Sequence, residues 1–232
     1  MRSRLLVMHV FLMVLPFCVA SSAKSNALKP FIVVDQTISL GTNGETAILQ
    51  IYLKKGEKVV DKDFSPIICG TKIEGSFVAK VKMPKSTVFV ETDLNRLMKT
   101  KKLSFCAGPW KVITKDYNGD GRIDFNLGQY GNSNGWLYWL FTILPSGRIN
   151  MLSIQDSILD GAVYLDDHKN SSDQIEVVPE GIRYLFYANT GDEQHPWGWW
   201  RSTWVWKSKD AKFVLSKEDH YGENRPASDD AP

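Results

Sequence analysis

The stretch Asp-Tyr-Asn-Gly-Asp-Gly-Arg-Ile-Asp at residues 116–124 places oxygen-bearing side chains at its first, third, fifth and ninth positions. Gly121 follows the third of them, where a loop wrapped around an ion must turn sharply. Ca²⁺ takes about six to eight hard oxygen ligands, a shell that three carboxylates, an amide, a backbone carbonyl and a water would fill. The stretch therefore predicts a calcium loop, although a metal-free hairpin turn, which also favours Asp, Asn and Gly, stays open. The predicted ligands are the side chains of Asp116, Asn118, Asp120 and Asp124 and the backbone carbonyl of Arg122.

The residues on either side of this loop are apolar at strand spacing. Val112 and Ile113 precede the loop, and Ile123, Phe125 and Leu127 alternate with polar residues at its end. An EF-hand requires helices here and a bidentate Glu at the twelfth loop position, which Leu127 occupies. The loop is therefore predicted to connect two β-strands.

This pattern resembles the FG-GAP or VCBS-type repeat of secreted and cell-surface proteins, whose loop runs D-x-[DN]-x-D-G-x-x-D, then an apolar strand, then Gly. The resemblance extends from Asp116 through Gly121 and Asp124 to the strand at 125–127 and Gly128. In that family the loop binds Ca²⁺ between two strands of a propeller blade. The resemblance implies the same metal and a blade-like setting here.

The rest of the chain is typical of short strands separated by turns. Apolar and polar residues alternate at 47–53 and 77–83, and the apolar run at 136–144 also predicts a strand. Leu94, Leu97 and Met98 lie at helical spacing, so one short helix is expected over 93–99.

Three predicted hairpins, at 52–60, 141–152 and 204–215, echo one another weakly. Each combines an aromatic or apolar strand, a polar turn and a second apolar strand. We therefore expect an all-β fold of antiparallel hairpin sheets, propeller-blade-like or an incomplete propeller, with a β-sandwich as the alternative.

The first residues have the organisation of a secretory signal. Arg2 and Arg4 form a basic start, residues 5–15 are apolar, and small residues at 18–20 or 21–23 suit cleavage. This apolar run is shorter than the roughly 20 residues that a membrane-spanning helix needs, and no later stretch is long enough. We predict a secreted or periplasmic protein with a signal peptide at 1–23, a single all-β domain at 24–222 and a disordered tail at 223–232.

Loss of Arg2 and Arg4 with the signal would leave 26 basic residues against 26 acidic ones. This balance lacks the basic stripe that nucleic-acid binding requires. Cys69 and Cys106 remain after the signal, and export to an oxidising compartment predicts a disulfide between them. Two buried thiols are the alternative.

Five of the eight tryptophans lie within residues 197–206. Trp200, Trp204 and Trp206 share one parity along a strand, and we expect them to pack inward. Trp197 and Trp199 are the candidates for an exposed surface that stacks a sugar.

No residue pattern points to catalysis. His168, His195 and His220 stand outside any zinc-ligand spacing. Residues 131–135 formally match G-x-S-x-G but lie between predicted strands, which favours a turn. The acidic residues beside His168 are interpreted as a solvated turn, and Asn-Ser-Ser at 170–172 is a formal glycosylation sequon.

Together these observations predict an exported, calcium-binding and non-catalytic β domain with a binding or structural role. The alternative is an extracellular carbohydrate-binding protein or a glycoside hydrolase with carboxylates from residues 156–167. The expected partner is carbohydrate or another extracellular protein.

Overall fold

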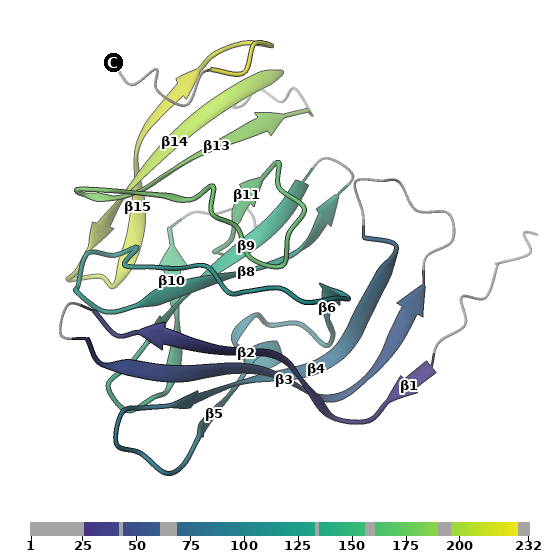
Figure 1. Cartoon of the computed structure of the whole chain (residues 1–232). Helices are drawn as coiled ribbons and strands as arrows, with labels where there is room; N and C mark the ends of the chain where they lie inside the picture. Colours follow the sequence, from purple (N-terminus) through teal and green to yellow (C-terminus); the bar gives the residue numbers. More distant parts are fainter. Residues whose placement is uncertain are drawn as a thin grey trace, which may run out of the picture.

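The computed structural model describes residues 26–41, 44–60, 69–132, 135–155, 161–189 and 196–226. The predicted signal peptide lies outside these residues, as do the last residues of the predicted tail. Nearly all regular structure in the described part is β, which confirms the predicted all-β class. Figure 1 shows the N-terminal strands at the bottom of the molecule, β8 (Asp124–Asn132) to β10 (Ile149–Ile154) in the middle and β13 (Gly181–Ala188) to β15 (Lys212–His220) at the top.

The first sheet is antiparallel and comes from the N-terminal part of the chain. Strands β3 and β4 pair along most of their length, and the other strands of this sheet each pair with one of these two. The helix α1 (Leu94–Leu97) directly follows the strand β5 (Val90–Asp93) and lies within the range 93–99 predicted for it. Asp93 caps the helix by accepting the Arg96 N–H at 3.0 Å. The strands of this sheet are β1 (Asn26–Leu28), β2 (Phe31–Ser39), β3 (Thr46–Val60), β4 (Thr71–Lys82), β5 (Val90–Asp93) and β6 (Leu103–Cys106).

The predicted hairpin at 52–60 is wrong, because β3 continues through these residues. Gly56 lies opposite Gly75 in the pairing of β3 with β4. A Cβ atom on Gly56 would come within 2.2 Å of the carbonyl oxygen of Glu74. The glycine therefore permits a close approach of two backbones, and it does not make a turn.

The second sheet contains the remaining strands. Its two halves join where β10 pairs in parallel with β15, at Ser153 with Lys212 and Ile154 with Phe213. Hairpins β9–β10 and β14–β15 confirm the predictions at 141–152 and 204–215. The strands are β7 (Thr114–Lys115), β8 (Asp124–Asn132), β9 (Gly135–Ile143), β10 (Ile149–Ile154), β11 (Val163–Leu165), β12 (Glu176–Val178), β13 (Gly181–Ala188), β14 (Gly198–Lys207) and β15 (Lys212–His220).

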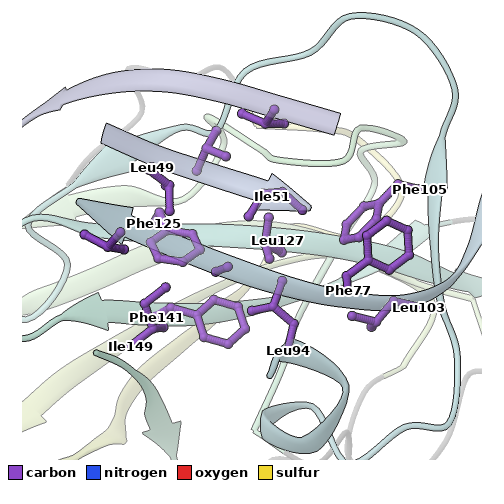
Figure 2. Close-up of a cluster of buried hydrophobic side chains, with 14 of the residues drawn as sticks. Leu49, Ile51, Phe77, Leu94, Leu103, Phe105, Phe125, Leu127, Phe141 and Ile149 are labelled. Atoms are coloured by element: carbon purple, nitrogen blue, oxygen red, sulfur yellow. The ribbon is translucent and has the colours of Figure 1, made fainter. Parts of the chain in front are cut away.

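Strand β9 lies between two hydrophobic clusters, which explains its nearly continuous apolar sequence. Phe141 belongs to the first cluster, where Figure 2 shows side chains of β8 and β9 beside Leu49 and Ile51 of β3. Tyr138 and Leu140 belong to the second cluster, which includes residues of β13, β14 and β15. The middle strands are thus covered on both faces.

Cys69 and Cys106 form a disulfide, with their Cα atoms 5.6 Å apart. Cys106 is the last residue of β6, and Cys69 lies just before β4. The bond therefore ties together the ends of two paired strands, and the predicted pairing is confirmed.

Candidate metal centre

The predicted calcium loop connects β7 to β8, and the two strands pair at Lys115 with Asp124 and at Thr114 with Phe125. A strand on each side is therefore confirmed, but the prediction misplaced the first one, because Val112 and Ile113 lie just before β7 and not within it. Gly119 and Gly121 have φ angles of 69° and 80°, in the left-handed region that glycine adopts most readily. These two glycines let the chain reverse direction within a few residues.

The first half of the loop is held by hydrogen bonds from its own backbone. Asp116 Oδ1 accepts the Asp120 N–H at 3.1 Å, and Asp116 Oδ2 accepts the Gly121 N–H at 2.8 Å. Asp120 Oδ1 accepts the Arg122 N–H at 2.9 Å. Asn118 Oδ1 also accepts from the Asp120 N–H at 3.1 Å. These contacts fix the loop's shape, and each carboxylate keeps further lone pairs because it has about four acceptor sites.

Asp124, at the ninth position of the loop, is completely buried. Its Oδ2 atom accepts the Tyr117 N–H at 2.9 Å and, more weakly, the Asn118 N–H at 3.4 Å. Its Oδ1 atom is buried without a hydrogen-bond partner. The hydroxyl of Thr142, opposite Asp124 in the sheet, interacts with the carboxylate but lies outside hydrogen-bonding geometry.

Burial raises the pKa of Asp124 to about 7. The cause is desolvation, which disfavours the charged form of a carboxyl group. The Thr142 hydroxyl and the Tyr117 N–H lower the pKa of Asp124, but their effect is smaller than that of desolvation. The Oδ1 atom therefore needs a proton or a cation when the loop is folded.

The donor set of the loop is made of hard oxygens, which suits Ca²⁺. Among the described residues, however, no three His, Cys, Asp or Glu side chains lie close enough together to hold a metal ion. Asp116 and Asp120 point their carboxylates at backbone N–H groups of the loop, whereas Asp124 is buried beneath it. The residues thus provide suitable ligands without a preformed cage.

A polar side chain in the middle of β8 connects the loop to a distant part of the chain. Asn126 is fully buried, and its Nδ2 atom donates to the Tyr117 hydroxyl at 2.7 Å and to the Ser172 carbonyl at 2.8 Å. Asn126 Oδ1 accepts the Ser172 N–H at 2.8 Å. This network was not predicted from the sequence, in which the local signal is an Asn between the apolar residues Phe125 and Leu127.

Residues 166–173, which we name the docking segment, lie against β8 and the end of β6. Asn170 is 5% exposed, and its amide accepts the Cys106 N–H at 2.8 Å and donates to the Cys106 carbonyl at 3.0 Å. The Asn170 carbonyl accepts the Gly128 N–H at 2.8 Å. The formal sequon is therefore buried in the folded protein.

The acidic residues beside His168 were expected to be solvated, and this prediction is wrong for Asp167. Asp167 is 5% exposed, and its Oδ2 atom accepts the Ser172 hydroxyl at 2.5 Å. Asp166 lies 3.7 Å from the His168 ring nitrogen Nε2. Of the other acidic residues proposed for hydrolysis, those at 156–160 lie outside the described residues.

The tryptophans of β14 differ in part from the prediction. Trp204 is buried in the second cluster and Trp206 packs against it, as expected. Trp200 is only half-buried, so its expected inward packing is wrong. Its ring stacks on His220 at 4.5 Å between centroids, and its Nε1 atom donates to the Pro196 carbonyl at 3.0 Å. Strand parity sets the face of a side chain, but the second cluster does not extend to the start of β14.

The two predicted sugar-stacking residues have different surroundings. Trp197 is 59% exposed. Trp199 is half-buried, with the Tyr187 ring 5.3 Å away and the Arg225 guanidinium 4.7 Å from its centroid. The Arg225 side chain therefore covers part of the Trp199 ring that a ligand would use.

None of the helices in the described residues has the length and apolar character to cross a bilayer. Comparisons with models of protein families, with curated proteins and with solved structures give no match.

Proposed function

We propose that this protein is an exported, non-catalytic β protein that binds Ca²⁺ at the loop 116–124. The observation that carries the proposal is the Asp124 carboxylate, which is fully buried with one oxygen lacking a partner. This residue stands at the ninth position of the loop, where a simple turn has no need of a third Asp.

A buried carboxylate with an unpaired oxygen can be satisfied in two ways. A proton neutralises Asp124 at low pH, and a cation neutralises it at high pH. At pH 7 and above, a proton becomes steadily harder to keep, because the pKa of Asp124 is about 7. A divalent cation is then the better partner, and the loop supplies the additional oxygens that Ca²⁺ requires.

The groups that would hold Ca²⁺ are those of the sequence prediction. Asp116, Asn118 and Asp120 would supply side-chain oxygens, Arg122 its backbone carbonyl, and Asp124 its buried oxygen. The ion would neutralise carboxylates that otherwise repel one another, and binding would draw the loop side chains together. The resemblance to FG-GAP or VCBS-type loops supports the same assignment.

Export is part of the proposal for two reasons. The Cys69–Cys106 disulfide is typical of proteins in oxidising compartments. Extracellular modules bind Ca²⁺ at about 10⁻⁴–10⁻³ M, which suits a loop without a preformed cage. The proposed role of the metal is to stabilise the fold for a binding or structural function.

Thermal melting with Ca²⁺, with Mg²⁺ and with a chelator tests the proposal. Ca²⁺ at about one hundred times its Kd should stabilise the fold by about 2.7 kcal/mol, and Mg²⁺ should have a much smaller effect because it resists losing its waters. Asp120→Ala should abolish the calcium response. Asp210→Ala is the matched control, because Asp210 is an exposed acidic residue in the β14–β15 turn. An equal calcium response in both variants would contradict the assignment of the site.

A further inference from the structure

An open cleft of about 340 Å³ is lined by residues of the N-terminal sheet, of the last part of β8 and of the middle of β9. Strands β4 and β6 and the segment after α1 contribute one side of it, and β8 and β9 contribute the other. None of its residues belongs to the loop 116–124. The lining residues are Lys72, Glu74, Met98, Thr100, Lys102, Leu103, Ser104, Gln129, Tyr130 and Trp139.

Two aromatic rings line this cleft. Tyr130, near the end of β8, is 40% exposed. Trp139 of β9 is half-buried and packs against the first hydrophobic cluster. Such rings offer flat apolar contact surface at low cost in conformational entropy.

The polar groups of the cleft carry both signs of charge and are already positioned. The Lys72 ammonium lies 5.2 Å from the centroid of the Tyr130 ring. Glu74 accepts a long hydrogen bond of 3.4 Å from the Ser104 hydroxyl, and Gln129 Oε1 accepts the Ser104 N–H at 2.7 Å. The cleft therefore presents hydrogen-bond donors and acceptors beside its aromatic surface.

The remaining cation of the cleft is neutralised by a neighbour. Lys102 Nζ lies 2.8 Å from Glu57 Oε1. With Lys72 and Glu74 opposite in sign, the cleft has no strong excess of positive charge. A phosphate or sulfate would lack a cluster of free cations here, and a wholly apolar ligand would leave the charged groups desolvated and unpaired.

We propose that this cleft binds a neutral saccharide, with the Tyr130 ring stacking on a sugar face and Lys72 and Glu74 bonding to its hydroxyls. A sugar matches both features of the cleft, because it has apolar C–H faces and hydroxyls that donate and accept. Among the described residues that line the cleft, Glu74 is the one carboxylate, whereas a glycosidase needs two. The site therefore binds sugar without cleaving it.

The cleft is a better sugar site than the tryptophans predicted from the sequence. Trp197 is exposed and Trp199 is half-buried, but neither of them is among the residues that line this cleft. Tyr130 combines exposure with neighbouring polar groups, as ligand sites generally do.

The test uses the full-length protein and an array of neutral oligosaccharides, with acidic and sulfated glycans as a second arm. The best neutral binder is then titrated calorimetrically against wild type, Tyr130→Ala and Lys72→Ala, with Trp197→Ala as the aromatic control. Removing the stacking ring should weaken binding about tenfold, whereas Trp197→Ala should bind like wild type. Unchanged melting temperatures would show that the three substitutions leave the fold intact.

Three results would overturn the proposal: no neutral glycan binds, Tyr130→Ala binds like wild type, or only sulfated glycans bind and salt removes the binding. Repeating the titration in chelator separates this site from the calcium loop. Sugar binding that persists without Ca²⁺ is the expected result, provided that the protein remains folded.

Discussion

Tyr117 and Asp124 are joined through the backbone, since the Tyr117 N–H donates to Asp124 Oδ2 at 2.9 Å. The Tyr117 side chain is buried as completely as Asp124, and its hydroxyl accepts from Asn126 Nδ2 at 2.7 Å. Asn126 in turn bonds to Ser172 of the docking segment. The position of the buried carboxylate therefore depends on contacts made far along the chain.

The hydroxyl of Tyr117 should contribute to stability. Tyr117→Phe leaves the buried Asn126 amide with one acceptor fewer, which should lower the free energy of unfolding by about 1–3 kcal/mol. Tyr130→Phe is the matched control, because Tyr130 is exposed and such changes stay within about 0.5 kcal/mol. Urea unfolding of both variants in the same calcium concentration gives the comparison, and equal midpoints would contradict the role of the network.

Asn170 should be needed for the fold and unavailable for glycosylation. Asn170→Ala leaves the N–H and the carbonyl of Cys106 without their partner, at a cost of about 2–4 kcal/mol for the two bonds. Asn150→Ala, at an exposed position of β10, is the control and should change the free energy of unfolding only slightly. Peptide mass spectrometry of protein secreted by a eukaryotic host should find Asn170 unmodified, and a folded protein fully glycosylated there would refute the observed packing.

Loss of the disulfide should destabilise the protein. The two cysteines are 37 residues apart in the sequence, and closing a loop of this length restricts the unfolded chain by about 4 kcal/mol in the chain-entropy estimate. The double variant Cys69→Ala/Cys106→Ala should therefore unfold at lower urea than wild type. Thiol titration of the unfolded, unreduced wild type should find neither cysteine free.

Without Ca²⁺, stability should fall as pH rises from about 4 to about 7. An unfolded Asp has a pKa near 4, whereas burial raises the pKa of Asp124 to about 7. Between these values the folded state binds a proton that the unfolded state has released, so raising the pH favours unfolding. The loss is on the order of 4 kcal/mol in total. Unfolding of wild type and Asp124→Asn in chelator across this range isolates the effect, and parallel curves would exclude it.

The local sequence was sufficient to predict that residues 116–124 connect two strands, although it placed the first strand at Val112 and Ile113 and not at Thr114–Lys115. The Asp, Asn and Gly spacing of residues 116–124 and the alternation at Ile123, Phe125 and Leu127 are short-range signals, and the structure places these elements as expected. The disulfide also followed from the number of cysteines left after the predicted signal peptide.

Features that depend on distant contacts could not be predicted in this way. The burial of Asp124 depends on β9, and the burial of Asn170 depends on β6. Gly56 has the composition of a turn, yet its role is set by Gly75 on the partner strand. Trp200 has the parity of a core residue but lies beyond the cluster that would bury it.

The most direct test compares wild type and Asp124→Asn at pH 8 by calorimetry, each in chelator and in millimolar Ca²⁺. In chelator the variant should melt at a higher temperature than wild type, because it does not bury a charge. Ca²⁺ at about one hundred times its Kd should raise the wild-type melting temperature by roughly 5–10 °C and should leave the variant nearly unchanged. If Ca²⁺ leaves the wild-type melting temperature unchanged, the loop is an ordinary turn and the proposed calcium function is wrong.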